Sequence, residues 1–319
     1  MRGVSVAAPH SGSVSGGAAL LGQRVVQLSE VEQSAWNRRF VVTLSDQSRV
    51  EAVLYRGDTL CVSTQVGCAV ACPFCASGAR GLTRPLTLAE LCAQVTAVES
   101  LGTALQRVTA SGVGEPLHAP EAVPAFLRWC RERGTPASVT TSGGPLPRLR
   151  ELLAAPHNGV TISVHAGTEP TRARLVPHAP ALGPLFALLE ETVPRMSRTR
   201  RKKVALAYLL LAGENDTPDE LVAFASRVRP LGVAVHLYQH NPVDSSTLNG
   251  ATRESYERAY AHLRDAGLVV RMSSQARLEA NGGCGTLVAQ RGRPGRRGLP
   301  LVDQREPTDA SGVPLENDA

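Results

Sequence analysis

The chain contains 319 residues, of which 43% are hydrophobic, and this size and composition exclude a chain dominated by low-complexity sequence. Its formal net charge of +6 is compatible with a polyanionic partner such as nucleic acid, although many basic proteins bind none. Seven cysteines, an odd number in a long chain, argue against a secreted disulfide framework and favour thiols that are kept reduced.

The N-terminal residues 1–22 are rich in Gly and Ser, and Pro9 and His10 interrupt the apolar core that a secretory signal would need. We therefore expect a disordered lead-in on a cytoplasmic protein. The longest apolar run, VALAYLLLAG from Val204, falls well short of the ~20 residues that cross a bilayer, so we expect no membrane association.

Residues 39–55, RFVVTLSDQSRVEAVLY, alternate apolar and polar side chains on either side of a polar turn. This pattern predicts a β-hairpin, and we assign residues 23–59 to a small N-terminal β extension.

From Leu60 onward, short β-rich runs alternate with helical stretches about six times. This alternation predicts an α/β fold with parallel strands, either an open doubly wound sheet or a barrel, in which ligands gather at the carboxyl ends of the strands. Thr87 with Glu90 and Thr217 with Glu220 have capping-box spacing and predict two helix starts. The strand candidates are LCVS, RVTA, ASVTTS, VTISVHA, VALAYLLL, VAVHLYQ and LVVRM.

The last part of the chain, residues 289–319, is rich in Arg, Pro and Gly and then acidic. This composition predicts a flexible tail, which leaves residues 60–288 as the core domain.

Three cysteines, Cys68, Cys72 and Cys75, form the pattern C-x3-C-x2-C directly after LCVS, the first strand candidate of the core domain. A structural zinc site normally has four protein ligands and paired C-x2-C spacing, so a fourth ligand would have to come from elsewhere. An iron–sulfur cube with three cysteine ligands leaves one iron open to a ligand other than protein. Both readings are open from the spacing alone.

Further motifs accompany the three cysteines in a fixed order over roughly residues 39–288. They are CVSTQVGC from Cys61, GVGEPL from Gly112, TTSG at Thr140, ISVHAG at Ile162, LVP at Leu175, HNP at His240 and CGTL at Cys284. With them the sequence resembles the radical S-adenosylmethionine (SAM) enzymes, and more closely their RlmN/Cfr branch of RNA adenine methyltransferases, which carry CVSSQVGC and GMGEPL.

The resemblance implies a partial (β/α)6 radical-SAM barrel that binds a [4Fe-4S] cluster through Cys68, Cys72 and Cys75, with SAM on the open iron. It also implies a ribosomal RNA substrate, with tRNA as a second one, methylated at carbon 2 or carbon 8 of an adenine. An electron donor such as flavodoxin or ferredoxin would reduce the cluster, and we expect a monomer.

Three residues match the catalytic positions of the family. By resemblance, Cys284 accepts a methyl group from one SAM, and a radical from a second SAM removes a hydrogen from that methyl group. The resulting carbon radical then adds to the base. Glu51 matches the base that removes the ring proton, and Cys61 matches the cysteine that releases the protein–RNA adduct by forming a disulfide. Taken alone, Glu51 and Cys61 would more often be ordinary strand residues. For Cys284 the alternative is a free cysteine in a loop.

The residues that match SAM contacts follow the predicted strands, where glycine lets the backbone approach a ligand. Each alone is more often a turn or strand-end residue. They are Gly114, Glu115, Thr140, Ser163, Val164, His165 and Asn241. Cys92 and Cys130 lie on apolar helical faces and are expected in the core.

The chain departs from the family pattern in ways that bear on the substrate. Only a short segment precedes the hairpin, where relatives have a longer helical domain, and SQARLEANGG replaces the acidic pair before Cys284. The basic stretches at 195–203 and 291–298 could hold phosphates or be solvated surface. Three alternatives stay open: a radical-SAM enzyme with another acceptor, a non-catalytic iron–sulfur RNA-binding or sensor protein, and a zinc-bound module.

Overall fold

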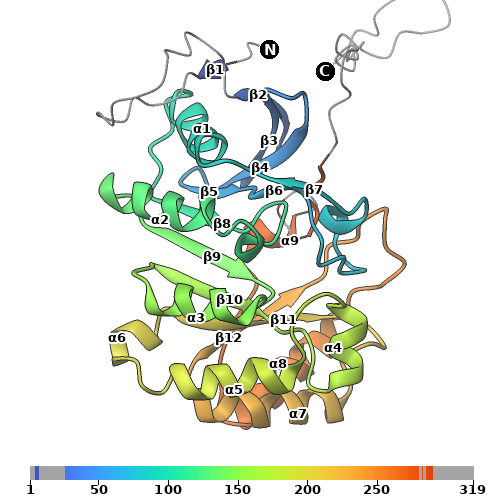
Figure 1. Ribbon diagram of the computed structural model, residues 1–319. Helices are drawn as coiled ribbons and strands as arrows, with labels where there is room; N and C mark the ends of the chain where they lie inside the picture. Colours follow the sequence, from blue (N-terminus) through green and yellow to red (C-terminus); the bar gives the residue numbers. More distant parts are fainter. Residues whose placement is uncertain (1–3, 7–25, 280–281, 283–284, 290–319) are drawn as a thin grey trace, which may run out of the picture.

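The computed structural model describes residues 4–6, 26–279, 282 and 285–289. Its main feature is one long sheet, which begins with antiparallel strands and continues as parallel ones (Figure 1). In sheet order the strands are β1 (Val4–Val6), β2 (Val26–Gln33), β3 (Asn37–Leu44), β4 (Arg49–Tyr55), β5 (Thr59–Val62), β8 (Arg107–Ala110), β9 (Ala137–Thr141), β10 (Gly159–Ser163), β11 (Val204–Leu210), β12 (Ala234–Gln239) and β13 (Val269–Met272).

The antiparallel part runs from β1 to β5 and contains the predicted hairpin as β3 and β4. Its turn is fixed by the amide of Ser48, which donates to Asp46 Oδ1 at 2.9 Å. Because β4 pairs with β5, the extension and the parallel strands form one continuous sheet. β1 falls within the expected lead-in, and the rest of that lead-in lies outside the described residues; the domain boundaries stay a prediction.

The parallel part confirms the predicted α/β barrel class. In the described chain, β5 and β8 to β13 pair in parallel. All seven strand candidates form, with LVVRM as β13, so the parallel part has one strand more than the six of the expected barrel. In Figure 1 the strands curve with α2, α3, α5 and α7 along the outer side. The helices are α1 (Leu88–Glu99), α2 (Ala122–Glu132), α3 (Leu146–Ala154), α4 (Glu169–Leu175), α5 (Leu182–Thr192), α6 (Arg198–Arg201), α7 (Pro218–Val228), α8 (Arg253–Asp265) and α9 (Gln275–Leu278), with 3-10 turns η1 (Ala76–Gly78), η2 (Pro116–His118) and η3 (Arg229–Leu231).

The core lies between the sheet and its outer helices. Every residue of β11 is buried, as its unbroken apolar sequence predicts for a central parallel strand. Cys92 on α1 and Cys130 on α2 are 2% and 0% exposed, which confirms them as core residues. Within the described residues, no helix is long and apolar enough to cross a bilayer.

The predicted helix starts at Thr87 and Thr217 are confirmed. At α1, Thr87 and Glu90 form the complete capping box. At α7, Thr217 caps the helix, but the carboxylate of Glu220 instead accepts from the amides of Gly167 at 2.6 Å and Thr168 at 3.2 Å. Glu220 therefore holds the loop that follows β10.

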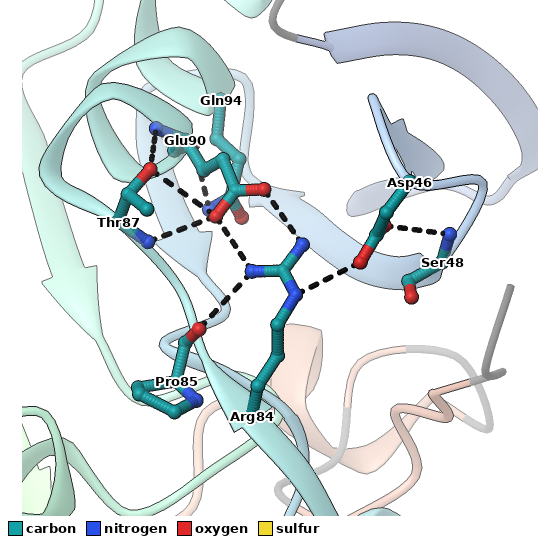
Figure 2. A network of polar contacts seen from close by, with 7 residues as sticks. All are labelled: Asp46, Ser48, Arg84, Pro85, Thr87, Glu90 and Gln94. Carbon is teal, nitrogen blue, oxygen red and sulfur yellow. Dashed lines mark hydrogen bonds and ion pairs between the residues drawn. The ribbon is translucent and has the colours of Figure 1, made fainter.

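A second, two-stranded sheet pairs β6 (Gln65–Gly67) with β7 (Leu82–Pro85) at the base of the loop that carries the three cysteines. Figure 2 shows how β7 is fixed: the guanidinium of Arg84 binds both oxygens of Glu90, at 2.9 and 2.8 Å, and Asp46 Oδ2 at 2.9 Å. This network joins β7, the first turn of α1 and the β3–β4 turn, so it holds the base of the cysteine loop rigidly.

Candidate active site

The loop at residues 68–81 brings Cys68, Cys72 and Cys75 into one cavity at the carboxyl ends of the strands. Its tight course depends on glycine at one point in particular. Gly67 has a φ of 85°, and a Cβ there would lie 1.9 Å from the carbonyl oxygen of Gly81. Only a glycine fits this close crossing of the two ends of the loop.

The three thiols are strongly desolvated. Burial raises the pKa of Cys68 to about 12, and burial and the neighbouring Cys75 and Cys68 raise the pKa of Cys72 well above its usual value. Burial therefore favours the neutral thiols, and a bound iron cluster would supply the positive charge that stabilises thiolates there.

The donor set fits an iron–sulfur cube with three protein ligands. In a cube each cysteine binds a different iron, so the sulfurs surround the cluster and do not converge on one point. Among the described residues, no group of three or more His, Cys, Asp or Glu side chains is arranged to hold a single metal ion.

The same cavity is lined by Gly114, Glu115, Thr140, Ser163 and His165, five of the seven residues predicted to contact SAM. Gly114 and Glu115 follow β8, Thr140 lies near the end of β9, and Ser163 ends β10 with His165 after it. The carboxyl ends of three neighbouring strands therefore meet around the cysteines. The other two lie elsewhere. Val164 is fully buried and outside the cavity lining, and the Asn241 side chain donates to the carbonyl of Arg277 at 2.9 Å; their role toward SAM stays a prediction.

His165 has a left-handed backbone, with a φ of 58°, which is uncommon for a residue other than glycine. Its Nδ1 accepts a hydrogen bond from the amide of Leu209 at 3.0 Å, and its ring packs edge-on against Phe74 of the cysteine loop. Burial and the nearby Arg172 lower the pKa of His165 to about 3, so the ring is neutral at physiological pH.

Glu115 is buried, and its carboxylate organises the end of β9. It accepts from the Thr141 hydroxyl, from the amide of Ser142 at 2.6 Å and from the amide of Leu117 at 3.0 Å. Each carboxylate oxygen can accept two hydrogen bonds, so Oε2, with one of these partners, can accept another from an amino group in the cavity.

Arg172 is a residue that sequence reasoning missed. It lies on α4, is 1% exposed, and donates to the carbonyls of Ser163 at 2.7 Å, Val164 at 2.9 Å and Ser142 at 2.7 Å. Burial lowers its pKa to about 10, so it stays a cation, near Cys72. This buried charge joins the carboxyl ends of β9 and β10 beneath the cavity.

Ser63, which follows β5, joins this strand end to Glu51 on β4 and to the loop after β8. Ser63 Oγ donates to the carbonyl of Glu51 at 2.6 Å and accepts from the amide of Val113 at 2.9 Å. Gln94 of α1 binds the amide and carbonyl of Ser63, at 2.9 and 3.0 Å. Cys61 itself lines the cavity from the end of β5.

The C-terminal segment 285–289 covers the cavity from the side of the cysteine loop. The amide of Ala76 donates to Gly285 O at 2.8 Å, and Ser77 Oγ donates to Leu287 O at 2.7 Å. At Gly285, whose φ is 90°, a Cβ would lie 3.6 Å from Cys75 Sγ. The residue that follows Cys284 in sequence is therefore hydrogen-bonded to the cysteine loop, at the residue next to Cys75.

The same segment reaches the predicted base. The amide of Val288 donates to Glu51 Oε2 at 2.8 Å, and Arg39 Nη1 lies 3.9 Å from that oxygen. Burial nevertheless raises the pKa of Glu51, against the opposing effects of these two partners. Cys284 lies outside the described residues, so its role stays a prediction.

The chain before this segment is anchored as well. Asn37 Nδ2 donates to the carbonyl of Ala276 at 2.6 Å and to Glu279 Oε2 at 2.7 Å. The guanidinium of Arg277 stacks on Tyr55 and Tyr238, which line the cavity, at 5.1 and 5.5 Å from the ring centres. Residues 276–279 and 285–289 therefore hold the two ends of the stretch that contains Cys284.

The basic stretch 195–203 lies away from this site. It contains α6 and directly precedes β11, so it is at the amino end of the strands, opposite the cavity (Figure 1). Arg200 there donates to the carbonyls of Leu153 and Ala154, at 2.7 and 2.8 Å, and so stabilises the end of α3. The stretch 291–298 lies outside the described residues.

None of the described cysteines forms a disulfide; they are Cys61, Cys68, Cys72, Cys75, Cys92 and Cys130. The disulfide expected between Cys61 and Cys284 is therefore not tested by the described residues.

Comparison with known families and proteins identifies the family of this chain. A profile described as "Radical SAM superfamily" matches residues 62–227, more than half of the chain. The chain belongs to the radical SAM superfamily. In sequence it is 30% identical over 288 residues to a "Probable RNA methyltransferase" of Chromobacterium violaceum, covering 87% of this chain and 80% of the relative. It is 32% identical over 287 residues to a "Probable dual-specificity RNA methyltransferase RlmN" of Parasynechococcus marenigrum, covering 85% and 83%.

Among solved structures, a radical SAM methyltransferase from Sphaerobacter thermophilus is similar, with a TM-score of 0.72, 31% identity, and coverage of 82% of this chain and 81% of that chain. Streptococcus suis SuiB bound to SAM shares the fold alone, with a TM-score of 0.52, 14% identity, and coverage of 68% and 50%. The expected RlmN-type radical SAM methyltransferase is thus confirmed as the chain's family, and a [4Fe-4S] cluster and SAM are its cofactors.

Proposed function

We propose that this radical SAM enzyme methylates a ring carbon, carbon 2 or carbon 8, of an adenine in ribosomal RNA, with tRNA as a second substrate. The methyl group would pass through Cys284, and the transient protein–RNA adduct would be resolved by Cys61. One observation carries the proposal. The segment that follows Cys284 is hydrogen-bonded both to the predicted cluster loop, at Ala76 and Ser77, and to Glu51, the predicted base.

When bound, the cluster and SAM supply the radical that activates the methyl group on Cys284. The residues of this chain would do the rest. Cys68, Cys72 and Cys75 would hold the cluster, and the five cavity residues at the ends of β8, β9 and β10 would orient SAM. Glu51 would take the ring proton, which requires it to be ionised, and Cys61 would attack the sulfur of Cys284.

An adenine can reach a buried cavity only if it leaves its stack, which costs a few kcal/mol in a duplex and less in a loop. Arg277, Tyr55 and Tyr238 at the cavity supply planar groups of the kind on which bases stack. We expect an unpaired adenine as the target. An electron donor such as flavodoxin or ferredoxin, a monomeric state and a cytoplasmic location complete the proposal.

The decisive experiment maps methylated adenines in RNA from cells with the protein, without it, and with Cys284→Ala. We expect one methylated ring carbon at a defined adenine, lost in both the deletion and the variant. Cys284→Ala should still assemble the cluster and bind SAM, because the methyl carrier is not a cluster ligand. An unchanged RNA methylation pattern, together with SAM cleavage on reduction, would instead favour a different acceptor.

A further inference from the structure

The sulfur of Cys61 belongs to a short chain of polar atoms. Cys61 Sγ lies 3.2 Å from Ser111 Oγ, and Ser111 Oγ lies 3.1 Å from Thr109 Oγ1. The cysteine and Thr109 are 3% and 7% exposed. The sulfur therefore faces hydroxyl groups where a packing cysteine would face apolar side chains.

The strand register explains this arrangement. β5 and β8 pair in parallel with Cys61 directly beside Thr109, so the two side chains share one face of the sheet. Ser111 comes two residues after Thr109, and side chains two apart in an extended chain point the same way. The hydroxyl of Ser111 thus reaches the cavity beside Cys61, and both residues line it.

The direction of the hydrogen bonds depends on the charge of the sulfur. A thiolate can only accept, so Ser111 must then donate to it, and Thr109 can donate in turn to Ser111, because each hydroxyl carries one proton and also accepts. A hydrogen bond to the charged form of a group favours that form. The two hydroxyls therefore favour a thiolate at Cys61.

Other described groups lie around the sulfur. On β4 its register partner is Val53, two residues from Glu51. The ionisable groups that line the same cavity are Tyr55, Cys68, Cys72, Cys75, Glu115 and His165. His165 is neutral, and a carboxylate near the sulfur would disfavour a second negative charge, whereas a hydrogen bond from the Ser111 hydroxyl favours it.

We infer that Ser111, supported by Thr109, is a positioning residue that holds Cys61 and favours its thiolate for resolution of the protein–RNA adduct. The inference rests on the proposed function. In the step it serves, the Cys61 thiolate forms a sulfur–sulfur bond with Cys284 and the carbon–sulfur bond of the adduct breaks. The bonding pair stays with the methylene carbon, which takes a proton and becomes the methyl group. Both cysteines are oxidised to a disulfide, which a thiol reductant then reduces.

The test uses the cluster-loaded protein and two readouts. The first is the rate at which methyl methanethiosulfonate modifies Cys61, followed by mass spectrometry of its peptide against pH. The second is the fraction of purified protein that carries RNA stable to denaturant. In Ser111→Ala we expect the pH midpoint of the Cys61 modification rate to rise by about one unit. We also expect the fraction of protein that carries RNA to increase several-fold over wild type. Ser111→Thr should restore both, and Ser226→Ala on the exposed face of α7 should change neither.

The Cys61→Ala variant distinguishes a failure of the proposed function from a failure of the inference about Ser111. If Cys61→Ala carries no RNA, the proposed function fails. If it traps RNA while Ser111→Ala keeps the wild-type pH midpoint and carries no excess RNA, the inference about Ser111 is wrong. Ser111→Ala that only lowers the melting temperature would likewise overturn it, since that is the effect of a structural role alone.

Discussion

The amide of Val288 and the carboxylate of Glu51 form a 2.8 Å hydrogen bond across 237 positions of sequence. This contact places the predicted base beside the segment that follows Cys284, while the Glu51 side chain is only 13% exposed. In the proposed mechanism this position brings the proton acceptor close to the base attached through Cys284.

Glu51→Gln keeps an oxygen that accepts from Val288 but removes the proton acceptor. We expect methylated RNA to fall at least about 100-fold, and covalently bound RNA to accumulate on the protein, because loss of a general base typically costs that much. Methylated nucleosides and RNA-bound protein can be measured by mass spectrometry. Glu30→Gln is the matched control, since Glu30 pairs with Arg38 on β2 and β3 and does not line the cavity. Normal turnover by Glu51→Gln would remove Glu51 from the mechanism.

The pH dependence follows from the raised pKa of Glu51. Because the base must be ionised, single-turnover release of RNA should slow as pH falls through a value above the usual 4.5, and this acid limb should be missing in Glu51→Gln. A carboxyl group with a raised pKa stabilises the fold below its ordinary pKa and loses that contribution as pH rises through the raised value. Glu51→Gln should therefore melt no lower than wild type at pH 7, and an acid limb that persists in the variant would assign it to another group.

Substitution of a predicted cluster ligand should abolish the cluster, whereas substitution of a cysteine in the core should affect only stability. Cys72→Ala is expected to abolish the visible absorbance of the cluster and the reductive cleavage of SAM together, because the cube loses one of three protein ligands. Cys130→Ala, in the core on α2, should keep both at a cost of about 1 kcal/mol in folding free energy. Iron, sulfide and zinc analysis of the same samples distinguishes a cluster from a zinc site. SAM cleavage by Cys72→Ala would show that the ligands are assigned wrongly.

Arg172→Met should destabilise the cavity walls. The carbonyls of Ser142, Ser163 and Val164 would lose a buried donor, and each such loss costs about 1–3 kcal/mol, so we expect the free energy of unfolding to fall by about 3 kcal/mol or more. Arg174→Met on the same helix is the control. Arg174 is 52% exposed and pairs with Glu214, so its loss should cost less than about 1 kcal/mol in urea unfolding. Equal effects of the two substitutions would contradict the role given to Arg172.

The strands and helices of the barrel could be predicted from local patterns in the sequence. The unbroken apolar sequence of β11 predicts a strand buried on both faces, and the Thr87–Glu90 spacing predicts the start of α1. The cysteine spacing places three thiols on one loop after the first strand of the barrel. Each of these features depends on residues close together in sequence, which is why periodicity and motifs suffice.

The rest depends on contacts between distant residues. Arg172 in TRARLVP has the sequence character of a solvated helical arginine, and only the fold turns it toward three strand-end carbonyls. Ser111 next to GVGEPL carries no sign of its contact with Cys61, because the parallel register of β5 and β8 creates it. The sequence LVVRM predicts β13 as a strand, but its place as the seventh strand of the parallel sheet depends on its pairing with β12.

The position of segment 285–289 at the end of the chain also has a consequence for biosynthesis. The other residues that line the cavity, from Tyr55 to Tyr238, leave the ribosome first, and Gly285 follows 47 residues after Tyr238. At translation rates of about 5–20 residues per second this leaves a period of roughly 2–10 s. During that period Cys68, Cys72 and Cys75, the predicted ligands, can be folded and still uncovered, so iron and sulfide could enter before the last wall of the cavity is in place.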